Sequence, residues 1–295
     1  MRCLLGRRAF VSSLPALAGT CLLPRWARAA KRPQQGRSRV VLVRDLSVFD
    51  GKGGLRPDVL EQMVGRGLAA LVGAPTAHEA WRSLFRPSDV VGIKSNVWRY
   101  LPTPAELEAV VQKGLRSGGV RPENISVDDR GVLKNPVFQR ATALLNVRPM
   151  RTHHWAGVGS LIKNYIMFVP DPARYHADAC ADLGAIWHLP HVRGKTRLNI
   201  LVMLTPQFHS VGPHSFHPDF VWRYGGLLFG GDPVAVDAVG LRIIEAKRRI
   251  FFGETRPLAT PPKHIRIAAE RYGLGTFDPA RIELSILGER RDLLL

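Results

Sequence analysis

The chain has 295 residues and a formal net charge of +18, and 45% of its residues are hydrophobic. This length is sufficient for one large domain, or two closely joined ones, with a full hydrophobic core. A strongly basic chain often binds nucleic acid, but this sequence has no helix-turn-helix, zinc-finger or RNA-stacking motif, so we expect no nucleic-acid partner. A generally basic surface, a groove for an anionic polymer and a site for a small anion are the remaining explanations.

Residues 1–29 are typical of a twin-arginine export signal. The pair Arg7-Arg8 precedes a short apolar stretch, and Ala27-Arg28-Ala29 forms a small-x-small cleavage site. No apolar run reaches the roughly 20 residues that a transmembrane helix requires, so we expect no transmembrane segment. The sequence therefore predicts a periplasmic or otherwise exported protein that uses the twin-arginine export machinery. Residues 30–39 are expected to form a polar linker, and 40–295 the folded domain.

Removal of this signal would leave Cys180 as the single cysteine, because Cys3 and Cys21 lie within residues 1–29. One cysteine allows no internal disulfide, no Cys-rich zinc site and no iron–sulfur cluster held by four cysteines of the chain. The signal also contains five of the arginines and no acidic residue, so the remaining chain has a formal charge of +13 and stays strongly basic.

Short apolar runs alternate with longer amphipathic segments after residue 40. The predicted strands span 40–44, 90–94, 125–129, 198–204, 225–230 and 282–287. The predicted helices span 57–73, 102–118, 171–189, 233–249 and 262–273. Several of these helical segments have Pro near the start and Gly at the end. The alternation predicts an α/β fold, a layered domain with a largely parallel sheet and helices on both faces.

Polar residues directly follow several predicted strands. Lys94-Ser95-Asn96 follows the apolar residues VVGI at the end of the second strand, and Asp128-Asp129-Arg130 follows ISV at the end of the third. Each has an ordinary structural explanation, such as a lysine that extends to solvent or a turn pair. However, ligands of open parallel sheets bind beyond the carboxyl ends of the strands, so this recurrence favours a binding site there.

Two charged residues lie in apolar surroundings. Asp237 belongs to a predicted helix that is apolar nearly all round, and Lys163 is flanked by apolar residues within RTHHWAGVGSLIKN, residues 151–164. A buried carboxylate needs a cation, a metal or several hydrogen-bond donors, or else it takes up a proton. We therefore expect Lys163 to meet either an anionic ligand or the Asp237 carboxylate, although a lysine that extends to solvent remains the alternative.

Eight of the ten histidines lie between residues 153 and 217, but their spacing matches no standard zinc motif. A pair of them joined by Asp237 would suffice for a His/carboxylate metal site. The chain also lacks a GxSxG elbow, a P-loop and a GxGxxG after the first strand. Hydrolase, NTPase and dinucleotide-binding functions are therefore unsupported.

The chain resembles the exported members of the family called domain of unknown function 362. The resemblance lies in AWRSLFRPSDVVGIKSN (80–96), GLRSGGVRPENISVDDR (114–130), RTHHWAGVGSLIKN, DPARYHADA (171–179), GGLLFGGDPVAVDAVG and RYGLG (271–275). It implies that the recurrent polar residues of the family fall on Lys94, Asn96, Asp129, Arg130, His153, Lys163, Asn164, His176, Asp232 and Asp237. Many relatives also carry a ferredoxin-like segment, and many have an acid where this chain reads Leu204-Thr205-Pro206; both features are missing here.

We expect an envelope enzyme that binds a small anionic substrate bearing a carboxylate or phosphate. The expected catalytic residues are Lys94, Lys163 and Asp237; the expected substrate-binding residues are Asn96, Asp129, Arg130 and Asn164. A divalent metal is one option as cofactor, with His153 and His176 as its ligands, and no iron–sulfur cluster is expected. The alternative is a non-catalytic exported protein that binds an anionic polymer or a protein partner.

Overall fold

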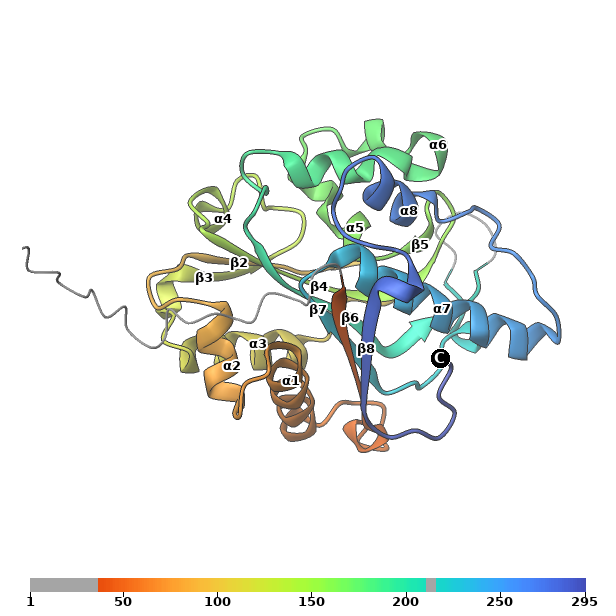
Figure 1. Cartoon of the computed structure of the whole chain (residues 1–295), viewed down its shortest axis with the longest axis horizontal. Coiled ribbons are helices and arrows are strands. Elements are labelled where there is room, and N and C mark those ends of the chain that lie inside the picture. The colour runs from red at the N-terminus through yellow and green to blue at the C-terminus, as the bar shows by residue number, and fades with distance from the viewer. Residues whose placement is uncertain (1–36, 211–215) are drawn as a thin grey trace, which may run out of the picture.

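The computed structural model describes residues 37–210 and 216–295 (Figure 1). The expected export signal, residues 1–29, lies outside the described residues. The sheet has eight strands: β1 (Ser38–Arg44), β2 (Val91–Lys94), β3 (Ile125–Asp128), β4 (Ala143–His153), β5 (Gly157–Gly159), β6 (Thr196–Gln207), β7 (Gly226–Gly230) and β8 (Ile282–Gly288). β1 therefore begins inside the segment expected to be the linker.

The strand order is β3-β2-β4-β6-β7-β1-β8, and β5 pairs with β4 outside this path. β3, β2, β4 and β6 run parallel to their neighbours, as do β1 and β8. β7 is antiparallel to β6 and β1, and β5 is antiparallel to β4. The sheet is therefore mixed but mostly parallel, as the sequence predicted.

Helices cover both faces of the sheet, which confirms the predicted layering (Figure 1). One face carries α1 (Pro57–Val72), α2 (Ala77–Leu84) and α3 (Ala105–Ser117). The elements on the other side include α4 (Pro136–Gln139), α5 (Leu161–Asn164), α6 (Ala177–Cys180), α7 (Pro233–Phe252) and α8 (Lys263–Glu270). The described helices include none that is long and apolar enough to cross a membrane.

The two helical layers give the domain two hydrophobic cores. In β1, Val41 and Val43 pack into the core with α1 to α3, whereas Val40 and Leu42 pack into the core with α7. Successive side chains of a strand point to opposite faces, so a central strand between two helical layers must be apolar on both sides. This explains the continuous apolar runs from which β1, β6 and β7 were predicted.

Two segments differ from the prediction. Residues 143–153 form the long strand β4, although no strand was predicted there. Residues 171–189 were predicted as one helix but form short 3₁₀ turns around α6. The break comes at Asp178, Ala179 and Cys180, whose φ angles of 46°, 57° and 61° are left-handed. Three consecutive residues in this region cannot continue a right-handed helix.

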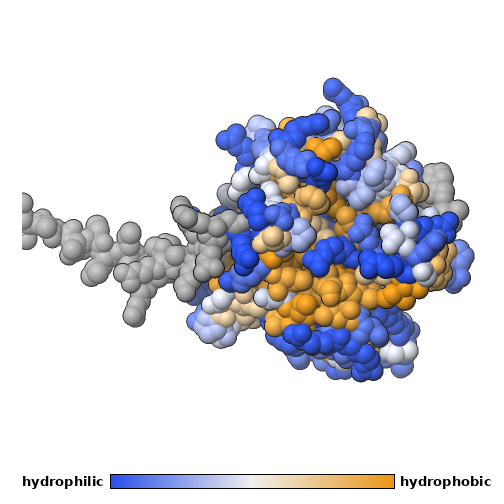
Figure 2. Space-filling model, turned by 45° about the vertical axis from the view of Figure 1, so that its right-hand side comes forward, coloured by the Kyte–Doolittle hydropathy of each residue, from blue (hydrophilic) through white to orange (hydrophobic). Residues whose placement is uncertain are grey.

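Much of the surface seen in Figure 2 is hydrophilic, with an apolar area between the charged side chains. Among the described residues, the large apolar side chains that are exposed include Ile250 and Phe251 near the end of α7. The charged residues singled out by the sequence are different, because most of them are buried at one edge of the sheet.

Candidate functional site

A buried ion pair lies at the carboxyl ends of β2 and β3. Lys94, the last residue of β2, is fully buried, and its ammonium pairs with the carboxylate of Asp129. The Lys94 Nζ also donates to the Ser95 carbonyl oxygen at 2.7 Å, and Asp129 accepts the Val97 amide at 2.9 Å. Burial lowers the pKa of Lys94 to about 8, although Asp129 opposes this change. Burial acts to raise the pKa of Asp129, but Lys94 outweighs it and holds the pKa below its usual value.

Buried asparagines link this ion pair to the centre of the sheet. The Asn164 Oδ1 accepts from Lys94 Nζ at 3.4 Å, and the Asn164 Nδ2 donates to Asn146 Oδ1 at 2.8 Å. Asn146 donates to Asn199 Oδ1 at 3.2 Å, and Asn199 donates to carbonyl oxygens at the end of β7. The half-buried Asn96 reaches the same Asn164 oxygen at 3.5 Å from the outside. These amides fix the positions of β2, β4 and α5 relative to one another.

Asp237 anchors the start of α5. The carboxylate is fully buried on α7, and its two oxygens accept the backbone amides of Leu161 and Ile162, each at 2.9 Å. These amides belong to the first turn of α5, where no partner exists within the helix. Burial raises the pKa of Asp237 to about 7, and hydrogen bonds from Ile162, Ser160 and Leu161 limit the rise. Asp237 therefore positions the segment that carries Lys163 and Asn164.

Lys163 does not form the expected ion pair with Asp237. No such pair occurs among the described residues, and the Lys163 Nζ instead donates to the Sγ of Cys180 at 3.7 Å. Because Asp237 is already occupied by backbone amides, Lys163 stays buried without a carboxylate partner. Burial lowers the pKa of Lys163 to about 8, and the charges of Arg148 and Arg151 contribute to the decrease.

Two arginines of β4 complete the charged interior. No pattern in the sequence predicted them. Arg148 and Arg151 are both buried, and the Nε atoms of both have no hydrogen-bond partner among the described residues. Burial lowers the pKa of both side chains, that of Arg148 to about 10. With Lys163 they form what we call the buried cation cluster: Arg148, Arg151 and Lys163.

The backbone leaves room for these arginines at one glycine. A Cβ on Gly159 would stand 2.5 Å from Nη2 of Arg148 and 3.5 Å from Cγ of Arg151. The register of β4 against β6 shifts between Pro149 and Arg151, where an irregularity accommodates a proline inside the sheet. On the outer side, Trp98 covers the cluster, with Cζ of Arg151 lying 3.8 Å from the ring centroid.

His153 and His176 do not come together as metal ligands. Nδ1 of His153 accepts the Trp155 amide at 3.2 Å, and the Trp155 ring contacts the His176 ring, with centroids 4.3 Å apart. The described residues contain no group of three His, Cys, Asp or Glu side chains that is suited to hold a metal. Burial, together with Lys163 and the two arginines, keeps the pKa of His153 far below its usual value, so its ring is neutral.

Arg130 lies outside the cluster. Its side chain is exposed after β3, so the buried guanidiniums come from β4 instead. Asp232, the other polar residue after a strand, caps α7 by accepting the amides of Val234 and Ala235. This helix-capping role is sufficient to explain an aspartate at position 232.

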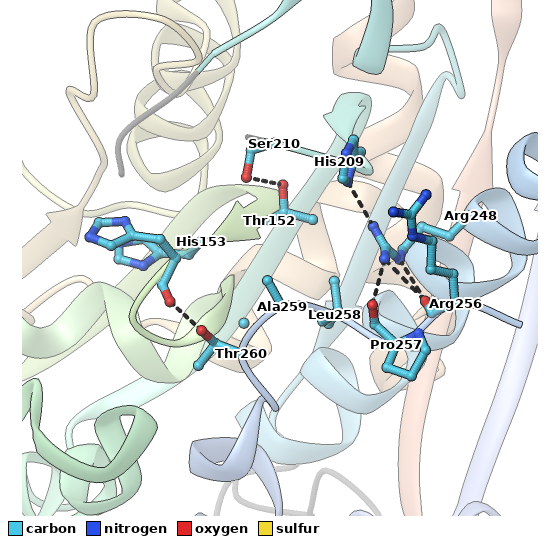
Figure 3. A pocket seen from close by; sticks show the side chains of 12 residues that line it. Thr152, His153, His209, Ser210, Arg248, Arg256, Pro257, Leu258, Ala259 and Thr260 are labelled. Atoms are coloured by element: carbon cyan, nitrogen blue, oxygen red, sulfur yellow. Dashed lines mark hydrogen bonds between the residues drawn. The ribbon is translucent and has the colours of Figure 1, made fainter. Parts of the chain in front are cut away.

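A pocket of about 580 Å³ adjoins the β4–β5 hairpin (Figure 3). Its lining includes Thr152, His153, His209, Arg248 and Thr260. Arg248 holds one wall by donating to the carbonyl oxygens of Phe208, Arg256 and Pro257. In Figure 3 the His153 imidazole points away from Arg248 and Pro257. The lining of the pocket includes His153 but none of the three members of the buried cation cluster.

The fold and the site define an α/β protein with a buried, positively charged interior at one edge of a mostly parallel sheet. The chain belongs to the family described as domain of unknown function (DUF362), and the model of this family matches residues 91–242. That segment contains Lys94, Asp129, the buried cation cluster and Asp237. Comparison with curated proteins finds no match, and comparison with solved structures finds none either.

Proposed function

We propose that the protein is an exported enzyme of the cell envelope that binds a small anionic substrate at the buried cation cluster. The substrate bears a carboxylate or a phosphate. The observation that carries this proposal is that three buried cations, Arg148, Arg151 and Lys163, have no carboxylate of the described residues within ion-pair distance. A buried charge without a counter-ion is unfavourable by several kcal/mol, so an anion that enters this interior is bound strongly.

The surroundings of the cluster suit recognition of an anion. The Nε–H groups of Arg148 and Arg151 are donors without an acceptor among the described residues. An anion that accepts from a guanidinium forms a charge-assisted hydrogen bond, which is about twice as strong as a neutral one. Since Nδ1 of the neutral His153 already accepts the Trp155 amide, the ring proton is expected on Nε2, which makes His153 a further donor.

Lys163 is the residue best suited to transfer a proton. With a pKa of about 8, it exists as a mixture of amine and ammonium near neutral pH, so it can release or accept a proton without a large energetic penalty. Lys94 has a similar pKa but is held by Asp129, so its role is to position that carboxylate and Asn164. Asp237 acts through α5, which places Lys163; it is a positioning residue.

Isothermal titration calorimetry of the full chain tests the proposal. Phosphate, sulfate and acetate are titrated at constant ionic strength into the unsubstituted protein, Arg151→Gln and the control Arg116→Gln. Arg116 is an exposed arginine at the end of α3. We expect at least one of these anions to bind the unsubstituted protein and the control alike, and Arg151→Gln to lose at least about tenfold in affinity. If none of the three anions binds the unsubstituted protein, the proposal is refuted.

The same variants separate the alternative function. A non-catalytic binder of an anionic polymer would use exposed arginines, so its affinity for a polyphosphate would stay unchanged in Arg151→Gln. The burial of the unpaired cations favours the small-anion enzyme, because a polymer cannot reach side chains that lie inside the domain.

A further inference from the structure

The charge of the buried interior does not balance. The site contains four buried cations, Lys94 and the three members of the buried cation cluster, and two buried carboxylates, Asp129 and Asp237. The other buried charged side chains of the described residues, Arg44, Asp89 and Arg248, have contacts elsewhere. Even with both carboxylates ionised, two positive charges remain. Asp129 is engaged by Lys94, and Asp237 by backbone amides. The charges of both carboxylates act on Arg148, but within residues 37–210 and 216–295 neither forms an ion pair with the cluster.

Two further carboxylates, Asp128 and Glu108, lie near the Lys94–Asp129 ion pair. Asp128 is half-buried, and its oxygens accept from the Gly131 amide and Asn135 Nδ2. Glu108 is half-buried on α3 and bonds to the Ser95 hydroxyl. Both are partly exposed to solvent, which screens their charges. Neither supplies the counter-charge that the cluster lacks.

The uncharged neighbours do not supply it either. His153 and the buried His264 are neutral, since burial and the nearby cations hold the pKa of both low. Burial raises the pKa of Cys180 despite Lys163, so Cys180 faces Lys163 as a neutral thiol. Tyr165 is also neutral, because burial raises the pKa of its hydroxyl above the usual value and thus keeps it protonated.

We infer that the site takes one compact group with two negative charges, the phosphoryl dianion or its sulfate analogue, rather than a single carboxylate. This inference rests on the proposed function and narrows its substrate class to phosphate-bearing molecules. A phosphoryl group carries a charge of about −1.5 to −2 and three acceptor oxygens. It therefore matches both the excess charge and the number of cationic side chains in the cluster.

The position of the cations supports a single compact group. The two arginine side chains are neighbours, because Nη2 of Arg148 and Cγ of Arg151 both lie next to the missing Cβ of Gly159. The charges of both arginines also act on Lys163. Two cations of β4 and one of α5 therefore act on one another within one buried interior, whereas two separate carboxylates would need cations that lie apart.

The test compares two tetrahedral oxyanions that differ in charge, sulfate and perchlorate. Both are titrated by calorimetry into the full chain at constant ionic strength, with Lys163→Met and the exposed-lysine control Lys134→Met alongside. We expect sulfate to bind at least about tenfold more tightly than perchlorate. In Lys163→Met this ratio should fall by about tenfold, because only one excess charge remains, and in Lys134→Met it should not change.

Each result decides between two statements. If perchlorate binds as tightly as sulfate, or if the ratio is unchanged in Lys163→Met, the site does not select for two charges and the inference fails, while the proposed anion site stands. If acetate binds as tightly as phosphate, the inference fails in the same way. If none of the four anions binds, the proposed function itself is refuted, together with the inference.

Discussion

Replacement of Lys163 by methionine should stabilise the protein when no ligand is bound. Methionine keeps most of the apolar stem of the lysine and removes its charge. Since the Lys163 Nζ contacts Cys180 and no carboxylate in the described part of the chain, the substitution leaves no orphaned counter-charge there. Replacement of a lysine in a buried ion pair would have the opposite effect. It would leave the partner charge buried and unpaired, which destabilises the folded protein by about 3 to 5 kcal/mol.

The magnitude follows from the pKa. Lowering the pKa of Lys163 from 10.5 to about 8 corresponds to about 3 kcal/mol of destabilisation of the folded protein at neutral pH. Loss of the weak hydrogen bond to Cys180 offsets about 1 kcal/mol of the gain. We therefore expect the free energy of unfolding to rise by about 2 kcal/mol in Lys163→Met at pH 7.

The effect should depend on pH. Because the pKa of Lys163 is lower in the folded state than in the unfolded state, the unfolded chain binds more protons between about pH 8 and pH 10.5. The contribution of Lys163 to stability therefore improves as the pH rises through this range. The advantage of Lys163→Met should be full at pH 7 and largely lost by pH 10.5.

Urea denaturation of the unsubstituted protein, Lys163→Met and the exposed control Lys134→Met at pH 7 and pH 10.5 measures this prediction. The control should stay within about 0.5 kcal/mol of the unsubstituted protein at both pH values. A Lys163→Met protein that is less stable at pH 7, or whose stability difference is the same at both pH values, would refute the reasoning.

Three further predictions concern Asp237, Gly159 and the export signal. Because burial raises the pKa of Asp237 to about 7, the stability it contributes when protonated is full below about pH 4 and lost as the pH rises through 7. Urea midpoints of Asp237→Asn should thus vary less between pH 4 and pH 7 than those of the unsubstituted protein; an equal variation would contradict this. Gly159→Ala should displace the Arg148 guanidinium and weaken sulfate binding in calorimetry by at least about tenfold, unlike Gly231→Ala, where a Cβ meets no atom within 4 Å; equal affinities would contradict it. Replacement of Arg7-Arg8 by two lysines should retain the precursor inside the cell in a fractionation assay, and normal export through the same pathway would contradict it.

The sequence predicted one part of the site well, because that part depends on a general property of parallel sheets. Lys94 is the last residue of β2 and Asp129 directly follows β3. Because β2 and β3 are parallel neighbours, their carboxyl ends must lie side by side. The apolar period of α7 likewise predicted a buried Asp237. Both arguments use only patterns within one element and the rule that connects neighbouring strands.

The arginines of the cation cluster could not be found in this way. β4 contains Asn146, Arg148 and Arg151 and is interrupted by Pro149, so it lacks the apolar run or strict alternation that predicts a strand. The one signal in the sequence was a proline between the two arginines. A proline in a central strand implies an irregularity in the strand. Without the strand, no argument could place these side chains inside the sheet.

The partner of Asp237 shows why a pair of buried opposite charges is weak evidence for contact. Both Asp237 and Lys163 are buried, and pairing them is the simplest way to balance the charges. The first amides of a short helix are equally good partners for a carboxylate, and α5 has only four residues, so it cannot form without such a partner. Asp237 therefore serves the backbone of α5, and the lysine that this helix carries is left available for a ligand. Asp237, which the sequence suggested as the counter-charge of Lys163, therefore does not neutralise this lysine. It holds the helix that positions Lys163.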